Sequence, residues 1–366
     1  MIDSRVLIRG SGYAMIQRLS ISVLLIGLLI ACVDQVDLPI RQTERRLVVE
    51  GLVTDGPFPW VRLTYTGRYT SANPAPPELV VNDALVVIRD DQGRSVRLVP
   101  DPFAPAYYSL RDSTFTGQVG RSYILSVTLP DGTSYESRTE RLNPVPVLDP
   151  LRARYRRRLD YLRQPDVYDI LIDTQDPPTP ENYYRWSALA YGRRWVRFDP
   201  QNPPPSVFVT DDCACSCWVP TYGPPGDVLS DALVNGNRIS GRVVLSAPIQ
   251  AVGAQYVQVQ QFSLTRAAYQ YWTLFEQQRT RSGSLFDAQP ASIEGNVRAV
   301  KDTTIRALGF FGASAVSQQR LTIPGDTINY NRFLVRYGKQ FIPPTGNCFS
   351  NFSNPILVPP SGWPAR

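Results

Sequence analysis

The chain has 366 residues and a formal net charge of +6, with 43% hydrophobic and 19% charged residues. This composition predicts a folded protein with packed cores and argues against intrinsic disorder. The absence of histidine excludes Ser-His-Asp and Cys-His catalysis, and it excludes histidine as a metal ligand. The 32 acidic residues are interspersed with 38 basic ones, so we do not expect the concentrated basic face of a nucleic-acid-binding protein.

Residues 1–31 have the pattern of a bacterial lipoprotein signal peptide. Arg18 precedes an apolar run at residues 21–30, which is shorter than the ~20 residues of a membrane-spanning helix. The "LIAC" that ends at Cys32 resembles a lipobox, so we expect cleavage before Cys32 and acylation of its thiol. The alternatives are a cleaved signal with an incidental cysteine, or an uncleaved anchor. The first 14 residues are unlike a signal peptide, and translation could start at Met15.

Residues 32–46 are polar and charged, without a periodic pattern, and we expect them to form a tether to the membrane. From residue 47 the chain shows short runs of alternating apolar and polar residues separated by turn signals. Two such turns are predicted at residues 91–93 and 130–132. This spacing predicts an immunoglobulin-like or prealbumin-like β-sandwich over residues 47–145.

The proline-rich "NPVPVLDP" at residues 143–150 is predicted to connect this sandwich to a second β-rich domain over residues 151–350. Residues 351–366 are then a C-terminal tail. The second domain opens with an arginine-rich stretch at residues 151–163. We interpret this stretch as a solvated strand face, and contact with phosphate-bearing lipid or an acidic partner is the alternative. The apolar run at residues 307–323 is predicted to supply a closing strand.

One amphipathic helix is predicted near residues 265–281 of the second domain. Thr265 is a suitable N-cap residue. Ala268, Tyr271, Trp272 and Phe275 follow the i, i+3, i+4, i+7 spacing of a single apolar stripe. We interpret the stripe as the face by which the helix packs on the domain.

Four cysteines remain if Cys32 is acylated. Three of them are Cys213, Cys215 and Cys217 in "DDCACSCW", and the fourth is Cys348. A lipobox would place the chain beyond the inner membrane, where disulfides persist, so two disulfides are the favoured interpretation. One disulfide with two free thiols, or a four-thiolate zinc site, are the alternatives.

Few residues are candidates for catalysis. Acidic pairs such as Asp211 with Asp212, or Glu276 with Asp287, have the chemistry of a glycosidase, but a chain with 32 acidic residues contains such pairs by chance. Ser314 in "GASAV" has no histidine to activate it. We therefore expect no catalytic residue, no cofactor and no metal.

Exposed aromatic side chains offer a second interpretation, in which the protein is a free-standing surface binder of glycan or peptide. Trp186, Trp195 and Trp218 are the candidates for such a surface.

Several segments together resemble a known family. They are "RLVVEGLVTDG", "PENYYRW", "YVQVQQFSLTRAAYQYWTLFEQQ", "IEGNV" and "GFFGAS", and they resemble the lipoprotein family catalogued as domain of unknown function 4249 over about residues 32–350. The resemblance implies an outer-membrane lipoprotein of Gram-negative bacteria, often encoded beside TonB-dependent receptors, with no established activity. We expect a non-enzymatic accessory protein of a TonB-dependent transporter in nutrient uptake, facing either the periplasm or the cell surface.

Overall fold

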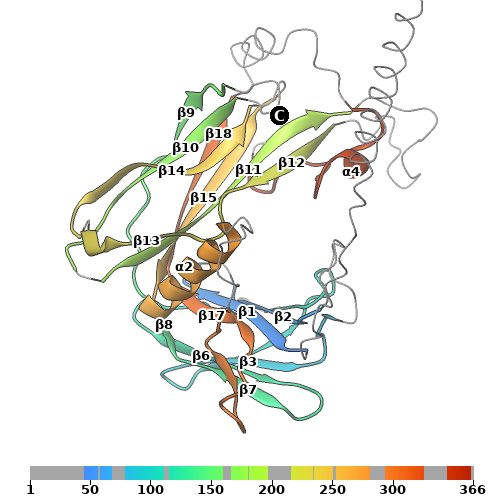
Figure 1. Ribbon diagram of the computed structural model, residues 1–366, viewed down its shortest axis with the longest axis vertical. Coiled ribbons are helices and arrows are strands. Elements are labelled where there is room, and N and C mark those ends of the chain that lie inside the picture. Colours follow the sequence, from blue (N-terminus) through green and yellow to red (C-terminus); the bar gives the residue numbers. More distant parts are fainter. Residues whose placement is uncertain are drawn as a thin grey trace, which may run out of the picture. The chain divides into compact units, whose positions relative to one another are not determined.

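The computed structural model of the chain (Figure 1) is mainly β and describes eleven stretches of the chain. They are residues 45–56, 58–67, 79–110, 115–159, 166–179, 181–196, 216–233, 235–249, 253–280, 293–324 and 344–363. All of them belong to one unit, Arg45–Arg366. The expected signal peptide and nearly all of the expected tether lie outside the described residues.

The first sheet has ten strands within the described residues, in the order β16-β7-β6-β3-β4-β5-β2-β1-β17, with β8 paired to β6. The Ala307 amide, directly before β17, donates to the Val297 carbonyl of β16 (3.0 Å), which brings the two ends of the sheet together. Its strands are β1 (Leu47–Thr54), β2 (Trp60–Tyr65), β3 (Leu85–Asp90), β4 (Ser95–Pro100), β5 (Tyr107–Ser109), β6 (Ser122–Thr128), β7 (Ser134–Ser137), β8 (Glu140–Arg141), β16 (Val297–Ala299) and β17 (Leu308–Ser314).

Alternation of buried and more exposed residues along the strands builds much of the core of this first sheet. In β6 every second side chain is buried, which is the period of a strand with one face inward. Val49, Leu63, Ile88, Leu125 and Phe311 are among the buried side chains that pack together there. Each contributes about 1.5–3 kcal/mol of hydrophobic stabilisation.

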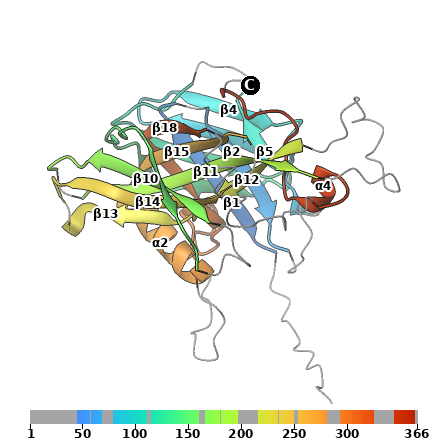
Figure 2. The same ribbon diagram turned by 90° about the horizontal axis from the view of Figure 1, so that it is seen from above.

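Two further sheets form the second core. One has the order β14-β10-β9, and the other has the order β12-β11-β15-β18, with β13 paired to β11. Buried side chains of both sheets pack against each other, and Figures 1 and 2 show the strands of the two sheets as adjacent layers. The strands are β9 (Arg152–Arg156), β10 (Val167–Gln175), β11 (Tyr183–Trp195), β12 (Ser216–Tyr222), β13 (Asp227–Ser230), β14 (Arg238–Pro248), β15 (Gln255–Leu264) and β18 (Val316–Ile323).

The chain crosses between the two cores a second time, beyond the predicted joint at residues 143–150. β17 pairs in parallel with β1 from Val48↔Leu308 to Thr54↔Ser314, and it therefore belongs to the first sheet. After Ala315 the same segment continues as β18 and pairs with β15 in the second core. Residues 307–323 are thus divided between two cores instead of closing the second domain alone. Pairing of strands so far apart in the sequence leaves no local sequence pattern.

Helix α2 (Arg266–Thr280) confirms the predicted amphipathic helix. The Thr265 hydroxyl accepts a hydrogen bond from the Ala268 amide (3.2 Å), as an N-cap does. Ala268 is buried against Phe310 of β17, and the Tyr271 ring centroid lies 5.0 Å from that of Phe310. The predicted stripe is therefore the packing face of the helix. The two short helices of the described residues are η3 (Asp231–Leu233) and α4 (Cys348–Asn351).

The parallel pairing of β17 with β1 requires a glycine at position 309. Its φ is 84°, and a Cβ atom there would lie 2.2 Å from the Val49 carbonyl oxygen. We predict that Gly309→Ala lowers the free energy of unfolding by about 3 kcal/mol or more, because it combines left-handed strain with a backbone clash. Denaturant titration of the purified variant measures this change.

Gly312 of the same strand is the matched control. The nearest atom to a Cβ there would be Leu52 Cδ1 at 3.7 Å, an ordinary contact. Gly312→Ala should leave the denaturation midpoint within a few tenths of a molar of the parent. Equal losses in the two variants would contradict the assigned register.

Candidate functional site

The structure forms one of the disulfides expected from the cysteines. Cys217 and Cys348 are bonded across 131 residues, with their Cα atoms 6.3 Å apart, and both side chains are fully buried beside Val196. Cys32, Cys213 and Cys215 lie outside the described residues, so acylation and a second disulfide stay predictions. Closing a loop of this length stabilises the fold by roughly 5 kcal/mol in the chain-entropy model.

Local sequence explains why Cys348 points toward Cys217. Asn347 caps α4, since its side chain accepts a hydrogen bond from the Ser350 amide (2.9 Å). The Ser350 hydroxyl in turn accepts one from the Asn347 amide (3.3 Å). This reciprocal cap fixes the start of the helical turn, and Cys348 is its buried first residue. Figures 1 and 2 both show α4 beside β12.

Residues 344–363, which we call the C-terminal segment, lie against the sheet that contains β12. Trp218 and Ile356 exchange two backbone hydrogen bonds (2.8 and 3.0 Å). Farther along, the Trp363 ring stacks on Tyr256 (4.9 Å between centroids), and Tyr256 stacks on Trp218 (4.8 Å). The segment is therefore held by a disulfide, a strand-like bridge and a stack of three rings.

A cleft of about 380 Å³ lies between the C-terminal segment and the outer face of this sheet. We call it the outer-face cleft. Arg320 of β18 lies in it, and its Nε donates to Gln258 Oε1 (3.0 Å) while its Nη1 donates to the Gly362 carbonyl (3.1 Å). Burial and the neighbouring Tyr222 raise the pKa of Tyr191, so that phenol stays protonated at neutral pH. The lining residues are Leu189, Tyr191, Tyr256, Gln258, Arg320, Ile356, Pro360, Ser361 and Trp363.

Three tryptophans were predicted to form an exposed binding surface, and the prediction is wrong for two of them, which are buried. Trp186 is 1% exposed, and its indole N–H donates to Gln261 inside the second core (2.8 Å). Trp218 is buried by the C-terminal segment, whereas Trp195 is 38% exposed at the end of β11. Alternation along a strand separates two faces, but it does not show which face a second sheet or a distant segment will cover.

A second cleft, of about 340 Å³, lies between β13 and α2 and contains two carboxylates, Asp227 and Glu276. Burial raises the pKa of Asp227, although Arg242 pairs with it. A hydrogen bond from Arg279 lowers the pKa of Glu276. Each carboxylate is thus engaged by a guanidinium group, which is the arrangement of a structural ion pair.

The structure does not describe both members of either acidic pair that was considered for a hydrolase. Asp211, Asp212 and Asp287 lie outside the described residues, and Glu276 is the member that the structure describes. Ser314 is 2% exposed and belongs to β17. Within the described residues, no group of three or more acidic or cysteine side chains is placed to hold a metal ion.

The arginine-rich stretch at residues 151–163 is paired along β9, its described strand. Arg156 donates from Nε to the buried Asp169 (2.6 Å), which also lies 3.5 Å from Arg154. Arg152 pairs with Asp173 (2.7 Å). Hydrogen bonds from Arg156 lower the pKa of Asp169, and hydrogen bonds led by that of Ser240 lower the pKa of Asp173. These two carboxylates compensate most of the charge of the three arginines and support the interpretation of the stretch as a solvated strand face.

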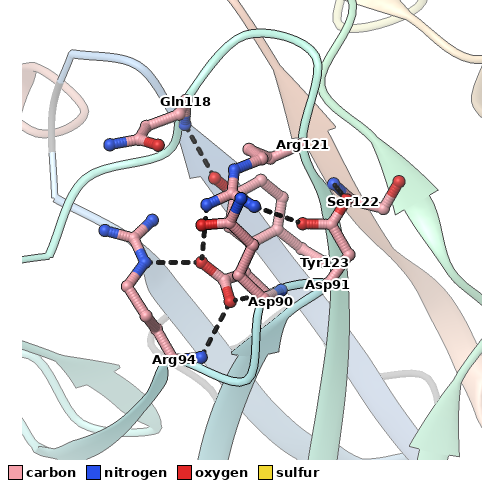
Figure 3. Close-up of polar contacts among 8 residues, drawn as sticks. Asp90, Asp91, Arg94, Gln118, Arg121, Ser122 and Tyr123 are labelled. Atoms are coloured by element: carbon pink, nitrogen blue, oxygen red, sulfur yellow. Dashed lines mark hydrogen bonds and ion pairs between the residues drawn. The ribbon is translucent and has the colours of Figure 1, made fainter.

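Figure 3 shows a polar cluster at the predicted turn between β3 and β4. The buried Asp90 carboxylate accepts hydrogen bonds from the Arg94 amide (2.8 Å) and from Arg94 Nε (2.6 Å). Arg121 pairs with Asp91 (3.0 Å), and the Tyr123 hydroxyl accepts from the Gln118 amide (2.7 Å). The polar groups of the cluster bond to one another and close the turn, so we interpret the cluster as structural.

A buried polar network joins the two cores around Glu140 of β8, which is 2% exposed. Its carboxylate accepts hydrogen bonds from the Thr265 hydroxyl (2.6 Å) and from the Asn296 side chain (3.3 Å). Asn296 also exchanges two hydrogen bonds with the backbone of Phe311 in β17 (2.8 and 2.9 Å). Burial raises the pKa of Glu140 to about 7, against the opposing effect of its hydrogen bonds.

Comparison with known proteins identifies the family. A family model described as Domain of unknown function (DUF4249) matches residues 33–320. The chain belongs to this family. A search of curated proteins finds no match. The DUF4249 match ends at Arg320, so the C-terminal segment with Cys348 and Trp363 lies beyond it. In the described part of this DUF4249 protein, no helix has the length and apolar character needed to cross a bilayer.

Sequence reasoning identified the cysteines but missed the outer-face cleft and the Glu140 network. Arg320 and Glu140 lie among other polar residues in their strands, and nothing nearby in the sequence distinguishes them from surface positions. Thr265 and Asn296 could have been noticed in the sequence, because Thr265 begins the helix and Asn296 lies in "IEGNV", and both segments resemble the DUF4249 family. The two partners of Glu140, Thr265 and Asn296, come from two distant segments, which only the fold brings together.

The raised pKa of Glu140 predicts a pH dependence of stability. Since the pKa is about 7 in the folded protein and near 4.5 in the unfolded chain, the favourable contribution is fully present below about pH 4.5 and is lost as the pH rises through about 7. We predict that Glu140→Gln raises the free energy of unfolding at pH 8 by about 3 kcal/mol. Urea titrations at pH 5, 6, 7 and 8 measure this.

Glu136→Gln on β7 is the matched control, because Glu136 forms an exposed pair with Arg89. Such pairs contribute about 0–1 kcal/mol, so this variant should follow the pH profile of the parent. Parallel profiles for the parent and Glu140→Gln across this pH range would contradict the assignment.

Proposed function

We propose that the protein is a lipid-anchored, non-enzymatic lipoprotein of the outer membrane that acts as an accessory or binding component of a TonB-dependent transporter in nutrient uptake. The observation that carries the proposal is the buried disulfide between Cys217 and Cys348. Such bonds persist in oxidising compartments. The lipobox-like "LIAC" ending at Cys32 supports the same location, and the DUF4249 resemblance supports the association with a transporter.

The chemistry of the chain supports a binding role over catalysis. The chain has no histidine, so the commonest general base of neutral-pH catalysis is absent. In the cleft between β13 and α2, the two carboxylates are engaged by Arg242 and Arg279. The polar residues that the structure describes at the centre of the fold, led by Glu140, hold the two cores together.

Residues 33–46 suit a tether between an acylated Cys32 and the first strand. Fourteen residues span at most about 50 Å when fully extended. A folded unit on such a tether could contact a membrane partner while the lipid holds it at the bilayer. Protease treatment of intact cells distinguishes a unit that faces the cell surface, which is cleaved, from one that faces the periplasm, which is protected.

A second candidate function is favoured by the outer-face cleft. A free-standing surface binder of glycan or peptide needs a concave site with aromatic and polar side chains. Tyr191, Gln258 and Arg320 provide these groups, although two of the three tryptophans considered for this role are buried.

Metabolic labelling tests the anchor. With an alkyne fatty acid in the medium, the parent chain should carry label and sediment with membranes, and Cys32→Ser should lose both properties. Cys215→Ser is the matched control and should keep them, because it leaves the lipobox unchanged. A labelled Cys32→Ser variant would contradict the proposal.

Extraction in mild detergent tests the association. The tagged parent chain should co-purify with a TonB-dependent receptor, and the complex should survive at least at low salt, where charge contacts are weakly screened. A chain that migrates alone at every salt concentration would favour the free-standing binder.

A further inference from the structure

Leu189, Gln258 and Arg320, on three neighbouring strands, line the floor of the outer-face cleft, and Tyr222 continues their row beyond it. Strand register places Tyr222 opposite Leu189, Leu189 opposite Gln258, and Gln258 opposite Arg320. Residues directly opposite each other share one face of a sheet. The neighbouring residues Ala188 and Val257 face the buried core instead. The row Tyr222, Leu189, Gln258 and Arg320 therefore belongs to the face away from the core.

The charge of the cleft comes from Arg320. Elsewhere in the described residues arginines commonly meet carboxylates, as Arg62, Arg152 and Arg156 do. Arg320 instead donates to two neutral acceptors, Gln258 Oε1 and the Gly362 carbonyl. These contacts fix the planar guanidinium at the cleft, and its five N–H donors exceed what the two acceptors use. No carboxylate lines the cleft.

The remaining lining groups suit hydroxyl-rich ligands. The Gln258 amide both donates and accepts, and the Tyr191 phenol does the same. In the next row on the same face, the exposed Gln318 is bonded to the half-buried Gln260 (3.2 Å). Planar amide, guanidinium and phenol groups form paired hydrogen bonds with adjacent hydroxyls, and Tyr222, which is 62% exposed, provides an apolar ring beside them.

We propose that the outer-face cleft binds a saccharide that carries a carboxylate, with the carboxylate at Arg320 and the hydroxyls at Gln258 and Tyr191. The volume of about 380 Å³ falls in the usual range of small-molecule sites, about 300–1,000 Å³. A guanidinium pairs with a carboxylate through two parallel hydrogen bonds, which gives preference for an acidic sugar over a neutral one. This assignment does not depend on the membrane anchor.

The C-terminal segment makes one wall of the site, so the disulfide is part of it. Pro360, Ser361 and Trp363 line the cleft, and the segment is tied to β12 by the bond between Cys217 and Cys348. Reduction of the disulfide removes the covalent bond between the C-terminal segment and β12. Affinity for the saccharide therefore falls when the disulfide is reduced, while the floor of the cleft stays in the sheet.

Isothermal titration calorimetry of the full chain in mild detergent tests the proposal. The probes are di- to tetrasaccharides of galacturonate, glucuronate and mannuronate, together with their methyl esters, which keep the hydroxyls and remove the charge. We expect at least one free acid to bind, with its ester weaker by about tenfold or more. Arg320→Gln should cause the same loss, and treatment with a reductant should weaken binding of the free acid.

Arg97→Gln is the matched control, because Arg97 is an exposed arginine on β4 of the first sheet. It should bind like the parent, and circular dichroism should show both variants folded. The proposal is overturned if no acid binds, if the esters bind equally, or if Arg320→Gln binds like the parent. It is also overturned if short peptides with a free C-terminal carboxylate bind and the saccharides do not.

Discussion

The hydrogen bonds around Ala315 are the constraint on which the rest of the structure depends. Ala315 separates β17 in the first sheet from β18 in the second core. Its amide donates to the Ser263 hydroxyl (2.9 Å), its carbonyl accepts from the Ser263 amide (3.1 Å), and the Ser263 hydroxyl donates to the Asn143 carbonyl (2.6 Å). The next amide, of Val316, donates to Asp55 at the end of β1 (2.8 Å). Four distant segments meet at this point, and each buried polar group finds a partner there, as burial demands.

The proline-rich joint at residues 143–150 is held by the same crossing segment. Residues 143–150 were expected to connect two separate domains, yet the Leu148 amide donates to the Ser317 hydroxyl (2.8 Å), and Gln319 donates to the Leu148 carbonyl (3.0 Å). Val145 packs against both cores. The joint is therefore fixed along its length, and the buried Glu140 network reinforces the same region.

Local features were predictable because their causes are local. The turn at Gly93, the N-cap at Thr265 and the packing stripe of α2 follow from residues close in sequence, and the structure has all three. The disulfide partner of Cys348 was narrowed to three cysteines by counting. The parallel pairing of β17 with β1, the burial of Trp186 and the position of Arg320 in a cleft were not predictable, because each depends on segments that are brought together only in the fold. A strand pattern defines two faces, and tertiary contacts decide which face is covered.

The central claim is that both cores form one cooperative unit through the segment around Ala315. Differential scanning calorimetry of the chain, with the disulfide intact, tests it most directly. A single transition is expected, with equal calorimetric and van't Hoff enthalpies. Substitution at the crossing by Ser263→Ala should lower the midpoint of that transition without splitting it. Two separate transitions in the parent chain, one of them with the enthalpy of a domain of about 100 residues, would contradict the claim and restore the picture of independent domains.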